Sequence, residues 1–121
     1  MIEPVTPDMH EAILALNNTH AAELSLMDAA GLGALLGEAF HARRIGNLEA
    51  FIIALDEQHE GYDSPNYRWF QARLPRFVYI DRVAVSEKAR GKGHARRLYA
   101  DLIERARNAG QRFLVCEVNS E

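Results

Sequence analysis

The stretch FVYIDRVAVSEKARGKGHARR, residues 77–97, decides the fold, because it joins an apolar run, a short polar turn and a glycine-rich basic loop. Residues 78–85 are β-branched, aromatic or small apart from two adjacent charges, which favours a largely buried strand. Apolar residues then recur from Ala95 at steps of three and four, the period of an amphipathic helix, and Gly110 is placed to end it. The sequence therefore predicts a strand, a short loop and a helix in that order.

The loop has the features of an anion site. The first backbone N–H groups of a helix have no partner within the helix, and the helix dipole places partial positive charge there. A phosphate group satisfies both, glycines let the backbone approach it closely, and Arg90 and Lys92 add full charges. The alternative is a solvated basic cap on an ordinary strand, turn and helix, because the loop matches neither the mononucleotide P-loop nor the dinucleotide fingerprint.

The loop resembles the acetyl-CoA pyrophosphate loop of the GNAT superfamily of N-acetyltransferases, whose pattern is Arg or Gln, two residues, Gly, one residue, and Gly or Ala. Arg90, Gly93 and Ala95 fill these three places. The strand before the loop, the helix ARRLYADLIERARNAG and the run RFLVCEVN look like the same family, so the resemblance covers residues 77–119. His94 stands where an aliphatic residue is more usual.

This resemblance implies an α/β (α+β) fold class, with a mixed, mostly antiparallel central sheet flanked by helices. At 121 residues we expect a single GNAT-like domain, residues 1–121. Family domains usually continue after the last of these strands with another helix and two strands, which often supply a tyrosine general acid, and these elements are lacking here. We therefore expect a C-terminally incomplete domain, or a homodimer in which a second chain completes the sheet.

The resemblance also implies that acetyl-CoA is the cosubstrate and that the acceptor is an amine of a small molecule or a peptide. In the family, backbone groups near the end of the strand bind the pantetheine arm, and the loop surrounds the pyrophosphate. The residues at the matching positions are Val83, Ala84, Val85, Arg90, Gly91, Lys92, Gly93, His94, Ala95 and Arg96.

Acetyl transfer to an amine needs a deprotonated nitrogen, and an alkyl amine with a pKa of about 10 is mostly charged at neutral pH. In several family members a carboxylate on the strand ahead of the loop acts as the base. Tyr79 and Asp81 lie there, and strict alternation places both on the face of Val83 and Val85. They are the catalytic candidates. Asp81 has an equal alternative as the structural partner of Arg82 or Arg112.

Direct transfer is the predicted route, and a backbone N–H near Val83 is placed to stabilise the negative charge that develops on the thioester oxygen. Cys116 suggests an acetyl-cysteine route, but within FLVCEV we predict that it is a small core residue. Two other classes stay open: a noncatalytic acyl-CoA-binding or interaction module, and an RNA-binding domain that uses basic residues 88–97. The RNA hypothesis lacks interleaved exposed aromatic residues.

The first quarter of the chain predicts a strand and two helices. Residues 2–5 have the composition of an edge strand. Thr6 can cap a helix with Pro7 at its first position, and the apolar stripe of that helix extends to Leu24. Asp28 can cap a second helix.

Residues 41–55 read as a hairpin, with Gly46-Asn47 as a two-residue turn and an apolar second strand in the centre of the sheet. Residues 56–76 have no period and predict a long loop, of the kind that often carries function. Its acidic and aromatic side chains predict either a site for a cationic amine or a lid packed by its own rings. They are Asp56, Glu57, Glu60, Tyr62, Asp63, Tyr67, Trp69 and Phe70.

The charge and composition of the chain limit the classes of function it can have. Residues 76–112 hold ten of the fourteen Lys and Arg but four of the seventeen acidic residues, so this segment carries +6 and the rest of the chain −9. Such a split suits a polyanionic cofactor beside a cationic substrate, although an uneven solvated surface also produces it. One cysteine and five scattered histidines show no metal-ligand spacing. We expect no metal, no nucleic-acid or membrane partner and a cytoplasmic location.

Overall fold

The computed structural model describes residues 2–19, 28–59 and 64–116. Within these residues the sheet has five strands in the order β1-β2-β3-β4-β5. The first four are antiparallel to their neighbours, whereas β5 runs parallel to β4. The strands are β1 (Ile2–Pro4), β2 (His41–Ile45), β3 (Ala50–Asp56), β4 (Phe77–Val85) and β5 (Phe113–Cys116).

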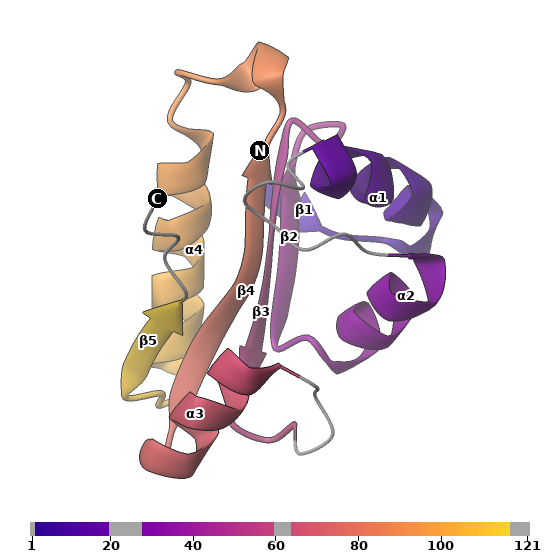
Figure 1. Ribbon diagram of the computed structural model, residues 1–121. Coiled ribbons are helices and arrows are strands. Elements are labelled where there is room, and N and C mark those ends of the chain that lie inside the picture. Colours follow the sequence, from indigo (N-terminus) through magenta and orange to yellow (C-terminus); the bar gives the residue numbers. More distant parts are fainter. Residues whose placement is uncertain (1, 20–27, 60–63, 117–121) are drawn as a thin grey trace, which may run out of the picture.

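Helices cover both faces of this sheet. α4 lies along one face, α1 and α2 lie on the other, and α3 lies near the end where β3 finishes and β4 begins (Figure 1). The predicted mixed, mostly antiparallel sheet flanked by helices is therefore confirmed. The helical segments are η1 (Pro7–Met9), α1 (His10–Thr19), α2 (Ala29–Glu38), α3 (Pro65–Arg73), η2 (Glu87–Ala89) and α4 (His94–Asn108).

β3 is the centre of the core, as its apolar run predicts. Its residues alternate between two apolar layers, and residues 50–55 are completely buried. On one side Ile52 packs with Leu98 and Leu102 of α4, and on the other Phe51 packs with Ile13 of α1. Burial of each such side chain contributes about 1.5–3 kcal/mol to folding.

Local capping signals are partly confirmed. Asp28 caps α2, because its side chain accepts a hydrogen bond from the Gly31 N–H at 2.8 Å. Gly110 follows α4 in the left-handed conformation, with φ +76°. Pro7 begins η1 as predicted, but the Thr6 hydroxyl contacts the Asp8 carboxylate and makes no capping hydrogen bond. Leu24 lies outside the described residues.

The predicted two-residue turn between β2 and β3 is wrong. Ile45 pairs with Ala50, so four residues connect the strands. The Glu49 N–H donates to the Ile45 C=O at 2.9 Å and closes this longer loop. Leu48 takes a left-handed φ of +69°, which sequence rules assign to glycine or asparagine rather than leucine.

The predicted loop at residues 56–76 contains a helix. Pro65 occupies the start of α3, and the Ser64 side chain accepts from the Tyr67 N–H at 3.3 Å, so the Ser-Pro pair was the missed start signal. Tyr67 of this helix is buried. Its hydroxyl donates a hydrogen bond to the Asp56 C=O and accepts one from the His59 N–H. Burial raises the pKa of this hydroxyl to about 12.

Two of the acidic side chains proposed to meet a cationic substrate make internal contacts. An Asp56 carboxylate oxygen lies 3.2 Å from His59 Nε2. The Glu57 carboxylate accepts from Gln111 Nε2 at 3.0 Å and lies 3.9 Å from Arg76 Nε. Burial raises the pKa of Glu57, but hydrogen bonds and Arg76 outweigh it and hold this pKa below its ordinary value. Of the other candidates in this segment, Glu60, Tyr62 and Asp63 lie outside the described residues, and Trp69 and Phe70 lie on α3.

Among the described residues β5 lies at the edge of the sheet. The side chain of Cys116 is exposed, which overturns the core position predicted for it. Phe113 is 44 % exposed and Leu114 39 % exposed, so both faces of the strand present apolar surface. Across the parts of the chain that the structure describes, no helix has the length and apolar character needed to span a bilayer.

His41 is buried between β2 and α4. Its Nε2 lies 3.1 Å from an Asp101 carboxylate oxygen, but the two are not aligned as a hydrogen bond. Burial is the largest cause that lowers the pKa of His41, and Arg43 and Arg105 lower it further against the opposing effect of Asp101. The folded chain therefore holds His41 neutral below the ordinary histidine pKa of 6.5.

We predict that His41 makes the fold less stable in mild acid. The unfolded chain binds a proton at His41 as the pH falls below 6.5, and the folded chain resists it, so the free energy of unfolding decreases with falling pH. Urea denaturation of the parent and of His41→Gln at pH 7.5 and 5.5 measures this. The parent should lose more stability than the variant, and equal losses would contradict the prediction.

Candidate functional site

The loop between β4 and α4 combines two left-handed glycines with a helix start. Gly91 has φ +82° and Gly93 has φ +76°, values that L side chains rarely adopt. A Cβ at either position would have no protein atom within 4 Å, so the backbone here faces open space. α4 begins directly afterwards at His94, which leaves its first N–H groups at the loop.

This open space is a pocket of about 430 Å³ at the N-terminus of α4. It brings together seven of the ten residues predicted to bind the cosubstrate and adds Ala89. Its lining residues are Val85, Ala89, Arg90, Gly91, Gly93, His94, Ala95 and Arg96.

The other three predicted binding residues lie elsewhere. Lys92 is exposed, and its Nζ lies 3.8 Å from a Glu49 carboxylate oxygen. Val83 is half-buried on the α4 face of the sheet, on the same face as Val85. Ala84 is buried on the opposite face, so only its backbone can face a ligand.

The electrostatics of the pocket favour an anion. Arg90 and Arg96 are exposed at its wall. Among the described residues neither guanidinium has a hydrogen-bond or ion-pair partner, so both are available to a ligand. The dipole of α4 adds partial positive charge at the same place. The residues present therefore fit a polyphosphate group.

β4 offers an open edge next to this pocket. β5 pairs with β4 only from Phe77 to Ile80, so beyond Ile80 no described residue pairs with that edge. The Ser86 N–H donates to the Glu49 C=O on the β3 side at 2.8 Å. Because N–H groups alternate in direction along a strand, those of Val83 and Val85 point to the open edge.

A β-bulge overturns the predicted common face of the catalytic candidates. Ile53 pairs with Arg82 while Ala54 pairs with Ile80, so Asp81 is an extra residue in β4. The extra residue reverses the alternation of faces. Tyr79 consequently lies in the layer of α1, α2 and α3, opposite the layer that contains Val83.

Tyr79 is deeply buried by aromatic neighbours. It is 3 % exposed, and its ring lies edge-on to that of Tyr67 with centroids 5.6 Å apart. Phe70 lies at 6.0 Å on the same side. The side chain therefore contributes to the core that supports β4.

Asp81 belongs to a buried polar network. Its carboxylate accepts from Arg82 Nε at 2.8 Å, and Arg82 Nη1 donates to the Asn17 amide oxygen of α1 at 2.9 Å. The network lies at the point along β4 where the pairing with β5 ends. This is the arginine partner foreseen as the alternative role of Asp81.

Sequence reasoning missed Glu49, which contacts the loop from the β2–β3 turn. Its carboxylate lies 3.3 Å from His94 Nε2, and His94 Nδ1 lies 2.7 Å from Arg97 Nη1. No local pattern marks Glu49, because its partner is far along the chain. His94 therefore has a polar function at a position where an aliphatic residue was the expected type.

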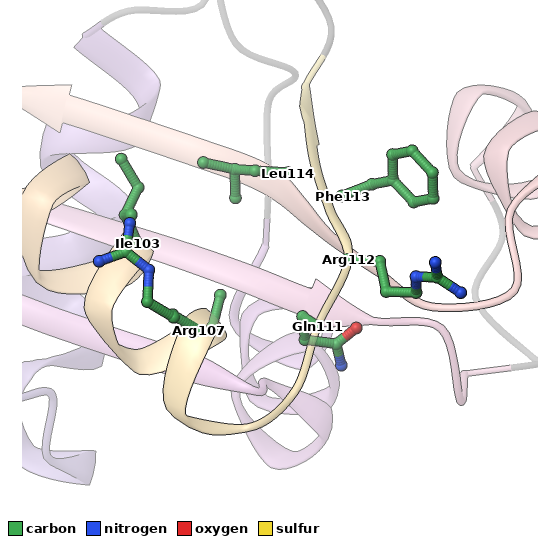
Figure 2. Close-up of a pocket in the computed structure, with 7 residues that line it drawn as sticks. Ile103, Arg107, Gln111, Arg112, Phe113 and Leu114 are labelled. Carbon is green, nitrogen blue, oxygen red and sulfur yellow. The ribbon is translucent and has the colours of Figure 1, made fainter.

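A second hollow of about 180 Å³ lies where α4 ends and β5 begins. Figure 2 shows Ile103, Arg107 and Leu114 on one side of β5, and Arg112 with Phe113 on the other. α4 is about 22 Å long at 1.5 Å per residue, so the two hollows occupy opposite ends of the helix. The dipole disfavours an anion at this C-terminal end.

The described residues contain no cluster of three or more His, Cys, Asp or Glu with metal-site geometry. The site thus consists of an anion pocket, an open strand edge and a buried polar network. These features lie in sequence along β4 and the start of α4.

Comparison with known proteins decides the family. The profile of the Acetyltransferase (GNAT) family matches residues 32–121. The chain belongs to the GNAT acetyltransferase family. GNAT proteins use acetyl-CoA as cosubstrate, and membership makes this chain an enzyme of the N-acetyltransferase type. A search of curated protein sequences finds no significant match.

Solved structures of similar fold are acetyltransferases. A ribosomal-protein-alanine N-acetyltransferase from Brucella melitensis is 24 % identical with TM-score 0.68, covering 98 % of this chain and 79 % of its own. A putative acetyltransferase from Agrobacterium tumefaciens is 17 % identical with TM-score 0.73, covering 100 % and 83 %. AAC(6')-Iy, in complex with the bisubstrate analog CoA-S-monomethyl-acetylneamine, is 20 % identical with TM-score 0.67, covering 100 % and 80 %. These likenesses show the GNAT fold.

The pocket predicts that Gly93 is sensitive to any added side chain. In Gly93→Ala a Cβ would stand in the open space against which a phosphate must pack, so CoA should bind more than about tenfold more weakly. Isothermal titration calorimetry with CoA measures the dissociation constant.

Gly110→Ala is the matched control. Gly110 has the same φ of +76° at the other end of α4, so both variants carry a similar backbone strain of about 1–2 kcal/mol. The control should lose stability and keep its CoA affinity. Equal CoA affinities in the two variants would show that the loop does not contact the phosphates.

Proposed function

We propose that this chain transfers the acetyl group of acetyl-CoA to a primary amine by direct attack. The observation that carries the proposal is the alignment of the anion pocket at the start of α4 with the open edge of β4. A ligand with phosphates at one end and an amide-containing arm at the other can contact both. Acetyl-CoA has this arrangement.

Binding divides between the loop and the strand. Arg90 and Arg96 pair with the phosphates, and the first N–H groups of α4 donate to them. The outward N–H group of Val85 is available to the pantetheine arm, which joins β4 in the manner of an additional strand, and that of Val83 is left for the thioester end. Val83 and Val85 present their side chains to the α4 face, so these contacts use backbone atoms.

The transfer step requires stabilisation of one oxygen and movement of two protons from the nitrogen. The amine nitrogen forms a C–N bond to the thioester carbonyl carbon, the C–S bond breaks, and the sulfur leaves as thiolate and takes up the proton that the nitrogen loses after attack. The Val83 N–H is placed to donate to the carbonyl oxygen while it carries negative charge. The ammonium proton of the acceptor must pass to a base before attack.

We assign the base to Asp81, directly or through a water molecule. The proposal is supported by the position of Asp81 in the chain, because this bulge residue directly follows Ile80, the last residue of β4 that pairs with β5. Arg82 holds one carboxylate oxygen, which fixes the orientation of the group. Tyr79 then acts in support, as part of the apolar layer beneath the bulge.

The acceptor is proposed as the amine of a small molecule or of a peptide. Two relatives of the same fold carry such acceptors in their names: an alanine of a ribosomal protein and a compound of the neamine type. The negative charge outside residues 76–112 favours a cationic acceptor on that side of the molecule.

Calorimetry with acetyl-CoA, followed by a thiol-release assay over a panel of amino acids, polyamines, aminoglycosides and peptides, tests the function. Saturable binding with amine-dependent release of CoA supports the transferase. Saturable binding without turnover on any amine would favour the noncatalytic acyl-CoA-binding module, and absence of binding would refute both.

We predict that Asp81→Asn lowers kcat/KM by about 100-fold or more at pH 7, because the amide keeps the shape of the carboxylate but accepts no proton. The residual activity should rise with pH as the free amine becomes more abundant. Steady-state kinetics from pH 6.5 to 9.5, with thermal unfolding as the control for folding, measure this. Unchanged kcat together with lowered stability would assign Asp81 a purely structural role with Arg82.

A further inference from the structure

The phosphate loop is tied to the β2–β3 turn through a chain of side chains. Glu49 of the turn contacts His94, His94 contacts Arg97, and Arg97 contacts the loop backbone. We infer that His94 is a positioning residue that holds the loop in its binding conformation through its hydrogen bond with Arg97. The inference rests on the proposed CoA site and adds a residue that positions it.

The anchor of this chain is rigid. The Glu49 N–H donates to the Ile45 C=O at 2.9 Å, and the Glu49 C=O accepts from the Ser86 N–H at 2.8 Å. The turn is thus bonded to β2 on one side and to the end of β4 on the other. The backbone of Glu49, which carries the carboxylate, is therefore held in place by both of these hydrogen bonds.

The geometry determines the tautomer of His94. Arg97 has only donors, so the His94 Nδ1 atom at 2.7 Å from Arg97 Nη1 must be an unprotonated acceptor. The ring proton consequently resides on Nε2, which lies 3.3 Å from the Glu49 carboxylate and donates to it. His94 is 8 % exposed, so its ring has little access to other partners.

Arg97 connects this ring to the loop. Its second amino group donates to the Lys92 C=O at 2.7 Å, between the two left-handed glycines. Because glycines have little intrinsic preference for one backbone conformation, a fixed contact to the residue between them narrows the conformations of the loop. These two contacts orient the Arg97 guanidinium toward His94 and the loop backbone, whereas Arg90 and Arg96 have no side-chain partner among the described residues.

The charged groups that contact His94 are Glu49 from the turn and Arg97 from α4. Lys92 of the loop lies 3.8 Å from the same Glu49 carboxylate. Loss of Nδ1 as an acceptor would remove one of the two contacts that orient Arg97. The Arg97 contact to the loop would then weaken, and CoA affinity would fall.

The first test compares variants of His94 by calorimetry with CoA at pH 8. His94→Leu should weaken CoA binding by about tenfold, because Arg97 loses a hydrogen-bonding partner. His94→Asn should weaken it less, since the Asn oxygen can replace Nδ1 as acceptor. Equal affinities of these two variants would overturn the inference.

A double-mutant cycle tests the coupling. If His94 acts through Arg97, Arg97→Leu should cost little further affinity in the His94→Leu background, whereas independent roles would give additive losses. Arg107→Leu removes the same charge further along the same helix, away from the pocket, and controls for a general loss of positive charge. Additive losses for His94 and Arg97 would refute the coupling.

Imidazole 15N NMR of the ligand-free chain tests the tautomer itself. His94 should carry its proton on Nε2 at pH 8, and a proton on Nδ1 would contradict the assignment. The outcomes separate this inference from the proposed function. If the parent binds no CoA, the proposed function fails, whereas CoA binding that is insensitive to His94 defeats only the positioning role.

Discussion

The unequal pairing of β4 is the constraint on which the site depends. Along its whole length β4 is hydrogen-bonded to β3, but β5 accompanies it only as far as Ile80. The bulge at Asp81 coincides with the end of that pairing. From there to Val85 the strand is held on one side by a completely buried neighbour, and its other edge is paired with no described residue. A rigid support and a row of backbone donors without a partner among the described residues are thus properties of one strand.

The two ends of α4 differ in charge, as in every helix, because the first turn has unpaired N–H groups and the last turn has unpaired C=O groups. At the first turn, two left-handed glycines keep Cβ atoms away from the helix start, and two guanidinium groups face the pocket. At the last turn, Gly110 ends the helix and the adjoining hollow is bordered by Ile103 and Leu114. Apolar contacts of Leu98 and Leu102 with the sheet fix the helix between these ends.

Local patterns in the sequence were sufficient where structure depends on neighbouring residues. The strand and loop of residues 77–97, the period of α4 and the Asp28 cap all follow from short-range chemistry. The faces of Tyr79 and Asp81 did not follow, because a bulge is defined by the pairing with another strand. α3 was missed because its nine residues give too little periodicity to outweigh their loop-like composition. Glu49 reaches the site only through tertiary contact, so a single sequence contains no sign of it.

The order of the strands in the sheet has a consequence for how the chain acquires its structure. Neighbours in the sheet are also neighbours in the sequence, so each strand follows its partner along the chain. Among the antiparallel pairs, β1 and β2 are separated by the longest connection. Only β5 needs a crossover, since it must pass over the sheet through α4 before it can align parallel to β4. Contacts that close long loops are expected to form late, and both the β1–β2 and the β4–β5 pairings are of this kind. The end of the β4–β5 pairing at Ile80, which defines the stretch of β4 that β5 does not accompany, would then be fixed late in folding.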